Sequence, residues 1–95
     1  KKVPVLVYAG DADFICNWMG NKAWTIDLQW YDKARFASAE DKPWMVDGKE
    51  AGEAREVGPF TFLRVYRAGH MVPYDQPANS LDMFNRWLNN KSYAV

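Results

Sequence analysis

The feature that most constrains the fold is a nearly continuous apolar run over residues 3–9, which Gly10 ends. An apolar run of this length, without polar alternation, is typical of a strand covered on both faces, as strands of parallel sheets are. Pro4 is compatible with a strand only near its start, which is where it stands. We therefore predict a buried strand over residues 3–9, within a parallel sheet.

Three further segments have the patterns of regular elements. Residues 17–30 favour a helix, and residues 60–67 are rich in β-forming side chains and predict a second strand. Asp75-Gln76-Pro77 opens a last helix, because proline fits the first helical turn. The first helix is expected to pack through Ala23, Trp24, Ile26, Leu28 and Trp30. The last helix has its expected core face, at helical spacing, in Leu81, Phe84, Trp87 and Leu88.

Residues 38–58 separate the first helix from the second strand. This stretch is polar and contains Pro43, Gly48, Gly52 and Gly58, so we expect a solvated excursion or hairpin rather than a functional charge patch. Helices between strands indicate an α/β architecture with a parallel sheet and right-handed crossovers. All 95 residues, 1–95, are expected to belong to one domain.

Composition argues against two classes of partner. The chain has 12 basic and 12 acidic side chains and no formal net charge, which removes the electrostatic basis for binding nucleic acid or an anionic membrane. It contains no apolar run of about 18 residues, so no membrane-spanning segment is predicted. Aromatic residues make up 16% of this short chain, which suggests a piece of a larger hydrophobic core.

Polar residues that could carry chemistry follow both predicted strands. Gly10-Asp11-Ala12-Asp13 follows the first strand and Gly69-His70-Met71 follows the second. In parallel sheets functional groups lie beyond the carboxyl ends of the strands, so Asp13 and His70 could meet there. A histidine that acts as general base needs a carboxylate on its other ring nitrogen. From spacing alone, a structural histidine with turn-capping aspartates is the more frequent explanation of such a pattern.

The residues leave three classes of function open. A triad in the chain order Ser, Asp, His would need a serine from elsewhere, because Ser38, Ser80 and Ser92 all lie outside any Gly-x-Ser-x-Gly motif. An aspartyl phosphatase would use Asp11 as nucleophile beside magnesium. However, no threonine directly follows Asp13 to hold phosphate, and no later acidic pair completes the metal site. The third class is a non-catalytic binding module. One histidine and two aspartates lack the usual spacing of metal ligands, so no metal is predicted.

Two motifs resemble those of the serine carboxypeptidases, a family of α/β-hydrolases. Val5-Leu6-Val7-Tyr8-Ala9-Gly10-Asp11-Ala12-Asp13-Phe14-Ile15-Cys16-Asn17-Trp18, continued by Gly20-Asn21-Lys22-Ala23-Trp24, resembles the segment around that family's catalytic aspartate. Ala68-Gly69-His70-Met71-Val72-Pro73-Tyr74-Asp75-Gln76-Pro77 resembles its catalytic histidine motif. The likeness covers about residues 3–90 and is greatest to the carboxypeptidase Y-like branch, which is similar to cathepsin A.

The resemblance implies an α/β-hydrolase fold, with this chain as its C-terminal portion: the last parallel strands and helices of a sheet that an upstream chain completes. It assigns the triad carboxylate to Asp13 and the triad imidazole to His70, whereas Asp11 falls on a supporting position. The implied activity is release of the C-terminal amino acid from peptides. A separate, larger N-terminal chain would supply the serine, so this chain alone is expected to be inactive.

Other residues receive roles only through the resemblance. Met71 matches a methionine on the leaving-group side of the site, and Cys16 matches an unpaired cysteine near the substrate pocket. Because Cys16 is the single cysteine, the two chains are expected to associate non-covalently. The family uses no metal or cofactor, and its members occur in the vacuole or lysosome or are secreted. The sequon at Asn90 is a candidate glycosylation site in that pathway. Trp18 and Trp24 are expected to be core residues.

Overall fold

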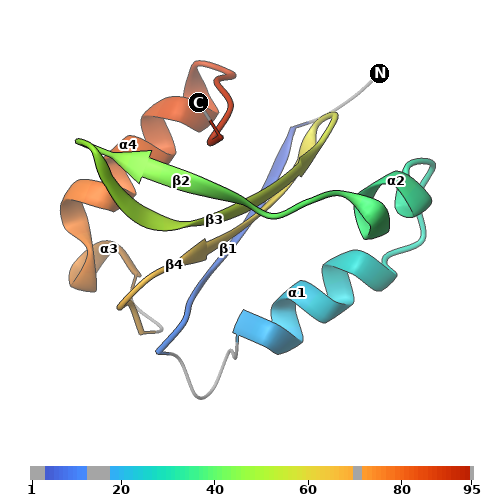
Figure 1. Cartoon of the computed structure of the whole chain (residues 1–95), viewed down its shortest axis with the longest axis horizontal. Helices are drawn as coiled ribbons and strands as arrows, with labels where there is room; N and C mark the ends of the chain where they lie inside the picture. Colours follow the sequence, from blue (N-terminus) through green and yellow to red (C-terminus); the bar gives the residue numbers. More distant parts are fainter. Residues whose placement is uncertain (1–3, 13–17, 70–71, 95) are drawn as a thin grey trace.

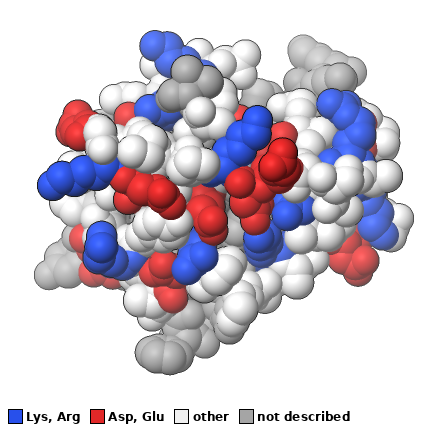
Figure 2. Space-filling model, viewed as in Figure 1, with Lys and Arg blue, Asp and Glu red and all other residues white. Residues whose placement is uncertain are grey.

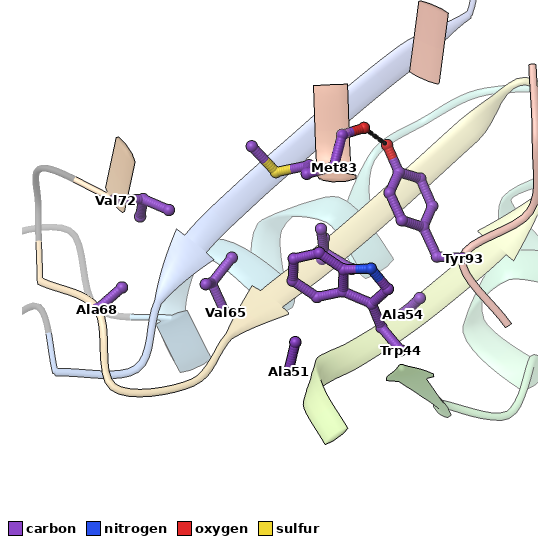
Figure 3. Close-up of a cluster of buried hydrophobic side chains, with 9 residues drawn as sticks. Trp44, Ala51, Ala54, Val65, Ala68, Val72, Met83 and Tyr93 are labelled. Carbon is purple, nitrogen blue, oxygen red and sulfur yellow. Dashed lines mark hydrogen bonds between the residues drawn. The ribbon is translucent and has the colours of Figure 1, made fainter. Parts of the chain in front are cut away.

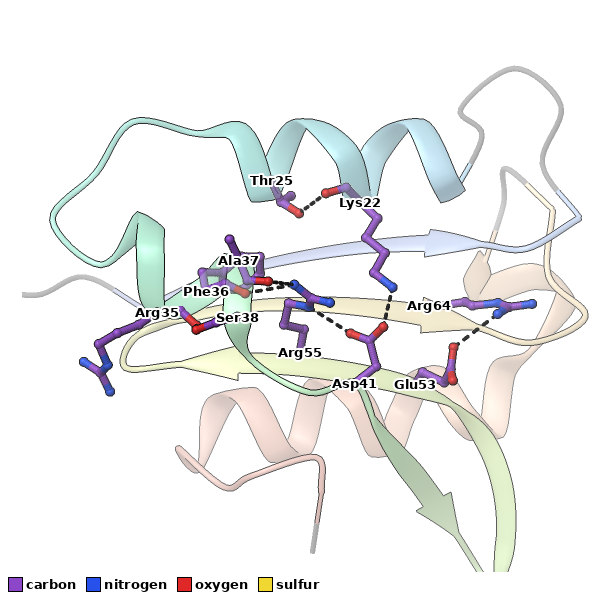
Figure 4. Close-up of polar contacts among 10 residues, drawn as sticks. All are labelled: Lys22, Thr25, Arg35, Phe36, Ala37, Ser38, Asp41, Glu53, Arg55 and Arg64. Atoms are coloured by element: carbon purple, nitrogen blue, oxygen red, sulfur yellow. Dashed lines mark hydrogen bonds and ion pairs between the residues drawn. The ribbon is translucent and has the colours of Figure 1, made fainter.

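The computed structural model describes residues 4–12, 18–69 and 72–94 (Figure 1). Within these ranges, four strands form one sheet in the order β1-β4-β3-β2. The strands are β1 (Val5–Gly10), β2 (Lys42–Val46), β3 (Lys49–Val57) and β4 (Phe60–Val65). The helices are α1 (Trp18–Asp27), α2 (Lys33–Ser38), α3 (Val72–Asp75) and α4 (Pro77–Leu88). Helices α1 and α2 lie on one side of the sheet, and α3 and α4 on the other (Figures 1 and 4).

The sheet is mixed rather than wholly parallel. Strands β1 and β4 pair in parallel over their whole lengths, with Gly10 opposite Val65. Strands β3 and β2 continue the sheet in antiparallel pairing. Their two-residue turn has φ values of 51° at Asp47 and 78° at Gly48, the left-handed backbone that a tight hairpin turn requires at both central positions. Asp-Gly suits this turn, because glycine and aspartate tolerate positive φ better than most residues.

Two apolar clusters cover the faces of the sheet. The cluster beneath α3 and α4 contains Trp44, Ala51, Ala54, Leu63, Val65, Ala68, Val72, Met83 and Tyr93 (Figure 3). The cluster beneath α1 and α2 contains Ala9, Phe36, Val57, Phe60 and Phe62. Phe62 and Leu63 are neighbours in β4 yet belong to opposite clusters, as the two-residue repeat of a strand requires.

The first of these clusters is fixed by hydrogen bonds at its polar atoms. The Trp44 side chain is fully buried, and its Nε1 donates to Asp82 Oδ2 at 2.8 Å. The Tyr93 hydroxyl donates to the Met83 carbonyl at 2.9 Å (Figure 3). The two rings pack edge to face, with centroids 6.1 Å apart. Large rings thus enter this core without leaving these two polar atoms unsatisfied.

The predicted core face of the last helix is wrong in this structure. The exposed fractions of Leu81, Phe84, Trp87 and Leu88 are 64, 42, 39 and 71%. The buried residues of α4 are instead Ser80 and Met83. At 100° per residue the four exposed side chains form one wide stripe, which adjoins the buried Met83 and includes the position of the buried Ser80. The rest of the stripe faces outward from the described chain.

The first helix also differs from its prediction. It ends at Asp27, and its buried residue is Thr25, whose Oγ1 donates to the Lys22 carbonyl at 2.7 Å. Trp24 is 47% exposed, so the expectation that it is a core residue is wrong. Trp18 is partly buried and packs against the cluster beneath α1 and α2. The apolar residues of α1 are scattered around the helix, which explains why periodicity did not identify its inner face.

Candidate active site

The carboxyl ends of β1 and β4 form the candidate site. Because the two strands are parallel, they end at the same edge of the sheet, and Figure 1 shows their two ends next to each other. The Ala12 N–H donates to the Ala68 carbonyl at 2.9 Å. Thus the segment that leads to Asp13 and the segment that leads to His70 are hydrogen-bonded to each other.

Gly10 permits this close approach. A Cβ atom at this position would lie 2.0 Å from the Ala68 carbonyl oxygen and 2.6 Å from that of Gly69. Both separations are far below van der Waals contact, and both obstructing atoms belong to the backbone. Any side chain at residue 10 would therefore force the two segments apart.

Asp11 joins the same two segments through its side chain. Its Oδ1 accepts a hydrogen bond of 2.8 Å from the Arg67 N–H. Its Oδ2 lies 3.4 Å from Nη2 of Arg64. Arg67 has a φ of 57°, so the chain turns sharply out of β4 at this residue. The Asp11 carboxylate holds that turn against the end of β1.

The start of the helical region supports the second segment from the other side. Asp75, in α3, accepts a hydrogen bond of 2.8 Å from the Gly69 N–H through its Oδ2. Gln76, which precedes α4, donates from Nε2 to the Arg67 carbonyl at 3.2 Å. Residues 67–69 are thus hydrogen-bonded to the segment that follows β1, to α3, and to Gln76 between α3 and α4.

A second polar network lies further from the strand ends, on the face covered by α1 and α2 (Figure 4). Asp41 contacts Lys22 and lies 2.9 Å from Nε of Arg55. Arg55 also donates from Nη1 to the carbonyls of Phe36 and Ala37, at 2.9 and 3.1 Å. Burial by itself raises the pKa of Asp41, but the hydrogen bonds from Arg55 and Lys22 outweigh it, and the pKa falls below its usual value. This network ties α1, α2 and β3 together.

Two tyrosines are held in the protonated form. The Tyr66 hydroxyl donates to Glu50 Oε2 at 2.6 Å, and burial together with this carboxylate raises the pKa of Tyr66 well above its usual value. Burial, with the carboxylates of Glu56 and Asp82 nearby, raises the pKa of Tyr93 to about 12. Neither phenol is therefore suited to accept a proton near neutral pH.

Charge is balanced locally over the surface as well as in total. Figure 2 shows acidic and basic side chains interspersed over the face that it views. Among residues 4–12, 18–69 and 72–94, no cluster of three or more histidine, cysteine, aspartate or glutamate side chains could hold a metal ion. None of the helices in those ranges has the length and hydrophobicity needed to cross a bilayer.

Most of the predicted site residues lie outside the described ranges. These are Asp13, Cys16, His70 and Met71. Their roles in the triad and the substrate pocket therefore stay predictions. Asn90 is described: it is exposed, it has a φ of 55°, and its N–H donates to the Trp87 carbonyl at 3.2 Å in the turn after α4. Its glycosylation also stays a prediction.

Sequence reasoning did not single out Arg64, which contacts Asp11 at the strand ends. The available signal was a permanent cation in a strand of largely apolar residues, because such a cation needs compensating partners. Asp75 and Gln76 were read only as the start of a helix, whereas both side chains also hold the segment before His70.

Comparisons with known proteins give the same answer as the motifs. A family model described as serine carboxypeptidase matches residues 1–90. Carboxypeptidase Y of Komagataella phaffii is 58% identical over 89 residues, which are 94% of this chain and 17% of that protein. The vacuolar serine-type carboxypeptidase ATG42 of Saccharomyces cerevisiae is 52% identical over 95 residues, which are 97% of this chain and 19% of that protein.

The fold has a counterpart among solved structures. The crystal structure of Kex1(delta)p, a prohormone-processing carboxypeptidase from Saccharomyces cerevisiae, superposes with a TM-score of 0.75 at 27% identity. The match covers 92% of this chain and 20% of that one. The chain thus spans about a fifth of the length of the carboxypeptidases that it matches. Since the family model covers nearly every residue, this chain belongs to the serine carboxypeptidase family.

Proposed function

We propose that this chain supplies the aspartate and the histidine of a Ser-Asp-His triad in a serine carboxypeptidase. The observation that carries the proposal is the hydrogen bond between Ala12 and Ala68. Asp13 follows Ala12 directly, and His70 comes two residues after Ala68. Both residues therefore follow closely on residues that lie together at one edge of the sheet. Membership of the family supports the assignment of the triad roles to them.

The proposed reaction releases the C-terminal amino acid of a peptide. The serine oxygen attacks the last peptide carbonyl while His70 accepts its proton, and Asp13 orients the imidazole and stabilises its charged form. His70 then returns the proton to the departing amino group, and water releases the acyl-enzyme in the same way. The chemistry needs no metal and no cofactor.

The serine would come from a larger N-terminal chain of the same enzyme. The three serines of this chain lie outside any nucleophile motif, and the hydroxyl groups of two of them are hydrogen-bonded elsewhere. Ser38 Oγ donates to the Arg35 carbonyl at 3.3 Å, Ser92 Oγ donates to Glu56 Oε2 at 2.7 Å, and Ser80 is buried in α4. None of them belongs to the segments at the ends of β1 and β4.

Two surfaces support a non-covalent association with that larger chain. Strand β1 lies at the margin of the sheet and pairs, within the described residues, with β4 alone. Val5 and Tyr8 on β1 are 45 and 37% exposed, and Leu81 and Leu88 on α4 are 64 and 71% exposed. A strand with one bonding edge open and a helix with an outward apolar stripe are suited to receive further strands and helices of one domain. The matched relatives are several times longer than this chain, which leaves room in them for such further elements.

We place the enzyme in the vacuole or elsewhere in the secretory pathway. One relative is named a vacuolar carboxypeptidase, and the exposed turn at Asn90 would be accessible to a glycan. The aspartyl phosphatase alternative is less well supported, because it needs Asp11 as a nucleophile. That carboxylate instead accepts from the Arg67 N–H and pairs with Arg64.

The test is fluorophosphonate labelling of the purified enzyme, followed by location of the adduct. We expect the adduct on a serine outside these 95 residues. Denaturing gel electrophoresis without reductant should separate the two chains. Their co-migration would contradict the non-covalent association. Magnesium-dependent phosphatase activity would favour the aspartyl phosphatase. A stable 95-residue domain with neither activity would favour a binding module.

The matched substitution test uses two aspartates. Asp13→Asn should lower kcat by about 10⁴-fold at an unchanged melting temperature, because the imidazole loses the carboxylate that orients it. Asp27→Asn is the control: that side chain is 87% exposed and forms a long ion pair with Lys33, at 3.5 Å. It should leave kcat unchanged. Equal rates for the two variants would remove Asp13 from the proposed role.

A further inference from the structure

One guanidinium group contacts both flanks of the segment that contains Asp13. Arg64 lies near the carboxyl end of β4, and its Nη2 is 3.4 Å from Oδ2 of Asp11. Its Cζ lies 3.8 Å from the centroid of the Trp18 ring, a close cation–π contact. Asp11 stands two residues before Asp13, and Trp18 begins α1 on the far side of residues 13–17.

The same guanidinium is anchored within the sheet. Its Nη1 donates to Glu53 Oε1 at 3.1 Å, across the register pair of β3 and β4 (Figure 4). The Asp11 carboxylate that faces Arg64 also accepts from the Arg67 N–H, in the segment that leads to His70. Arg64 is thus connected to three residues around the proposed triad: it contacts Asp11 and Trp18 directly, and Arg67 through Asp11.

We propose that Arg64 is a positioning residue, which fixes both flanks of the segment carrying Asp13 and, through Asp11, the turn that leads to His70. The proposal rests on the proposed function, since it concerns the geometry of that triad. It adds a residue that lies outside both family motifs quoted above. Arg64 acts through Asp11 and Trp18 and does not itself touch the reacting atoms.

Stability alone is a poor explanation for an arginine at this position. The Arg64 side chain is 27% exposed, and its buried Nε has no hydrogen-bond partner among the described residues. Removing a cation from water is unfavourable, and well-packed apolar side chains are often as stable as a buried ion pair or more so. The guanidinium instead provides directional contacts. Its planar fork reaches the carboxylates of Asp11 and Glu53 while its face stacks on the Trp18 indole.

Arg55 offers a matched control on the neighbouring strand. It too pairs with a carboxylate, Asp41, and lies over an aromatic ring, with its Cζ 5.7 Å from the Phe36 centroid. Its contacts, however, are with α2 and with the segment before β2, rather than with the strand ends. If replacing Arg64 lowered catalysis only by destabilising the protein, replacing Arg55 should lower catalysis as well.

The experiment compares Arg64→Met, Arg64→Lys and Arg55→Met in the complete enzyme, with competent active sites counted by fluorophosphonate titration. For Arg64→Met we expect kcat per active site to fall about 10- to 100-fold, because small displacements of catalytic groups have effects of this size. KM should change by less than about two-fold, since substrate contacts are unaltered. Arg64→Lys keeps the charge and should recover part of the loss. Arg55→Met should lower the melting temperature and leave kcat per active site unchanged.

A double substitution tests whether the effect passes through Asp11. Asp11→Asn should lower kcat per active site in the same direction as Arg64→Met. The combined variant should lose much less than the product of the two single losses, because both interrupt one connection. Losses that multiply in full would overturn the proposed route. If Arg64→Met fails to fold, Arg64→Lys and Asp11→Asn provide the same comparison.

The outcomes separate this inference from the proposed function. Normal labelling of a serine and an inactive Asp13→Asn variant, with an unchanged kcat per active site in Arg64→Met, would overturn the role of Arg64 alone. An unlabelled wild-type enzyme, or an active Asp13→Asn variant, would overturn both.

Discussion

The two faces of the sheet are built in different ways. Beneath α3 and α4 the contacts are apolar and centre on the fully buried Trp44, with two hydrogen bonds that satisfy ring substituents. Beneath α1 and α2 two arginines, Arg64 and Arg55, cross between strands, loops and helices through carboxylates and carbonyl oxygens. The contrast predicts that the first face chiefly supplies stability, whereas on the second face Arg64 positions the segments at the strand ends and Arg55 joins β3 to α2 and to the segment before β2.

The largest effect on stability should come from Trp44. Trp44→Ala would leave a large cavity and remove one of the hydrogen-bond donors to Asp82 Oδ2, so we expect the free energy of unfolding to fall by about 3–5 kcal/mol. Urea denaturation of the complete enzyme measures this change. The kcat per titrated active site should stay within about two-fold of the wild type at a temperature where both are folded. A large loss of kcat at full folding would break the division between the two faces.

Gly10 tests the strand ends directly. Gly10→Ala places a methyl group against the Ala68 and Gly69 carbonyl oxygens, so the two segments must separate. We expect kcat per active site to fall about 100-fold or more, with a loss of about 1–3 kcal/mol in stability. Gly20→Ala is the control, because a Cβ there meets nothing within 4 Å. Equal kcat values for the two variants would show that the close approach does not matter for catalysis.

Asp41 tests the polar face away from the strand ends. Its pKa is lower in the folded chain than its ordinary value of 3.8, so its ion pairs stabilise the fold above that pH. The contribution is lost as the pH falls through the depressed pKa of the folded state. Asp41→Asn should therefore reduce stability by about 1 kcal/mol at pH 7 and by a smaller amount near pH 3, which lies below the ordinary value of 3.8. Melting temperatures of both proteins at the two pH values give the comparison, and a difference that persists at low pH would contradict it.

The smallest effect on stability should come from Trp24, which lies on the opposite face of the sheet from Trp44. Trp24 is 47% exposed on α1 and donates from Nε1 to Asn21 Oδ1 at 2.9 Å. Trp24→Ala should change the free energy of unfolding of the complete enzyme by no more than about 0.5 kcal/mol, measured by urea denaturation as for Trp44→Ala. A loss similar to that of Trp44→Ala would show that the face beneath α1 also carries much of the stability.

The parts of the fold that followed from the sequence were those with strong local signals. The apolar run after Pro4 predicted β1, and the β-forming residues after Pro59 predicted β4. Pro77 marked the start of α4. The parallel pairing of these strands then placed Ala12 beside Ala68, which is the geometric basis of the candidate site.

Other parts depended on tertiary context. Strand β3 mixes alanine and glycine with charged residues, which are weak strand formers, and it is ordered by pairing with a strand on each side. The inner face of α4 was not recognised, because its buried residues are Ser80 and Met83, whereas its larger apolar side chains face outward. Arg64 was missed because Asp11, Trp18 and Glu53 come from three separate segments, and only the folded chain brings them together.

The parallel pairing of β1 with β4 has a consequence for the order of assembly. Strands β2, β3 and β4 follow one another through tight turns, whereas β1 must find β4 across the whole intervening chain. Loop-closure entropy makes such distant pairings late events in folding. We expect amide protons of the β3–β4 ladder to gain protection from exchange before those of β1 during refolding. A newly made chain would then form the β2-β3-β4 meander first and the edge that holds the candidate site last.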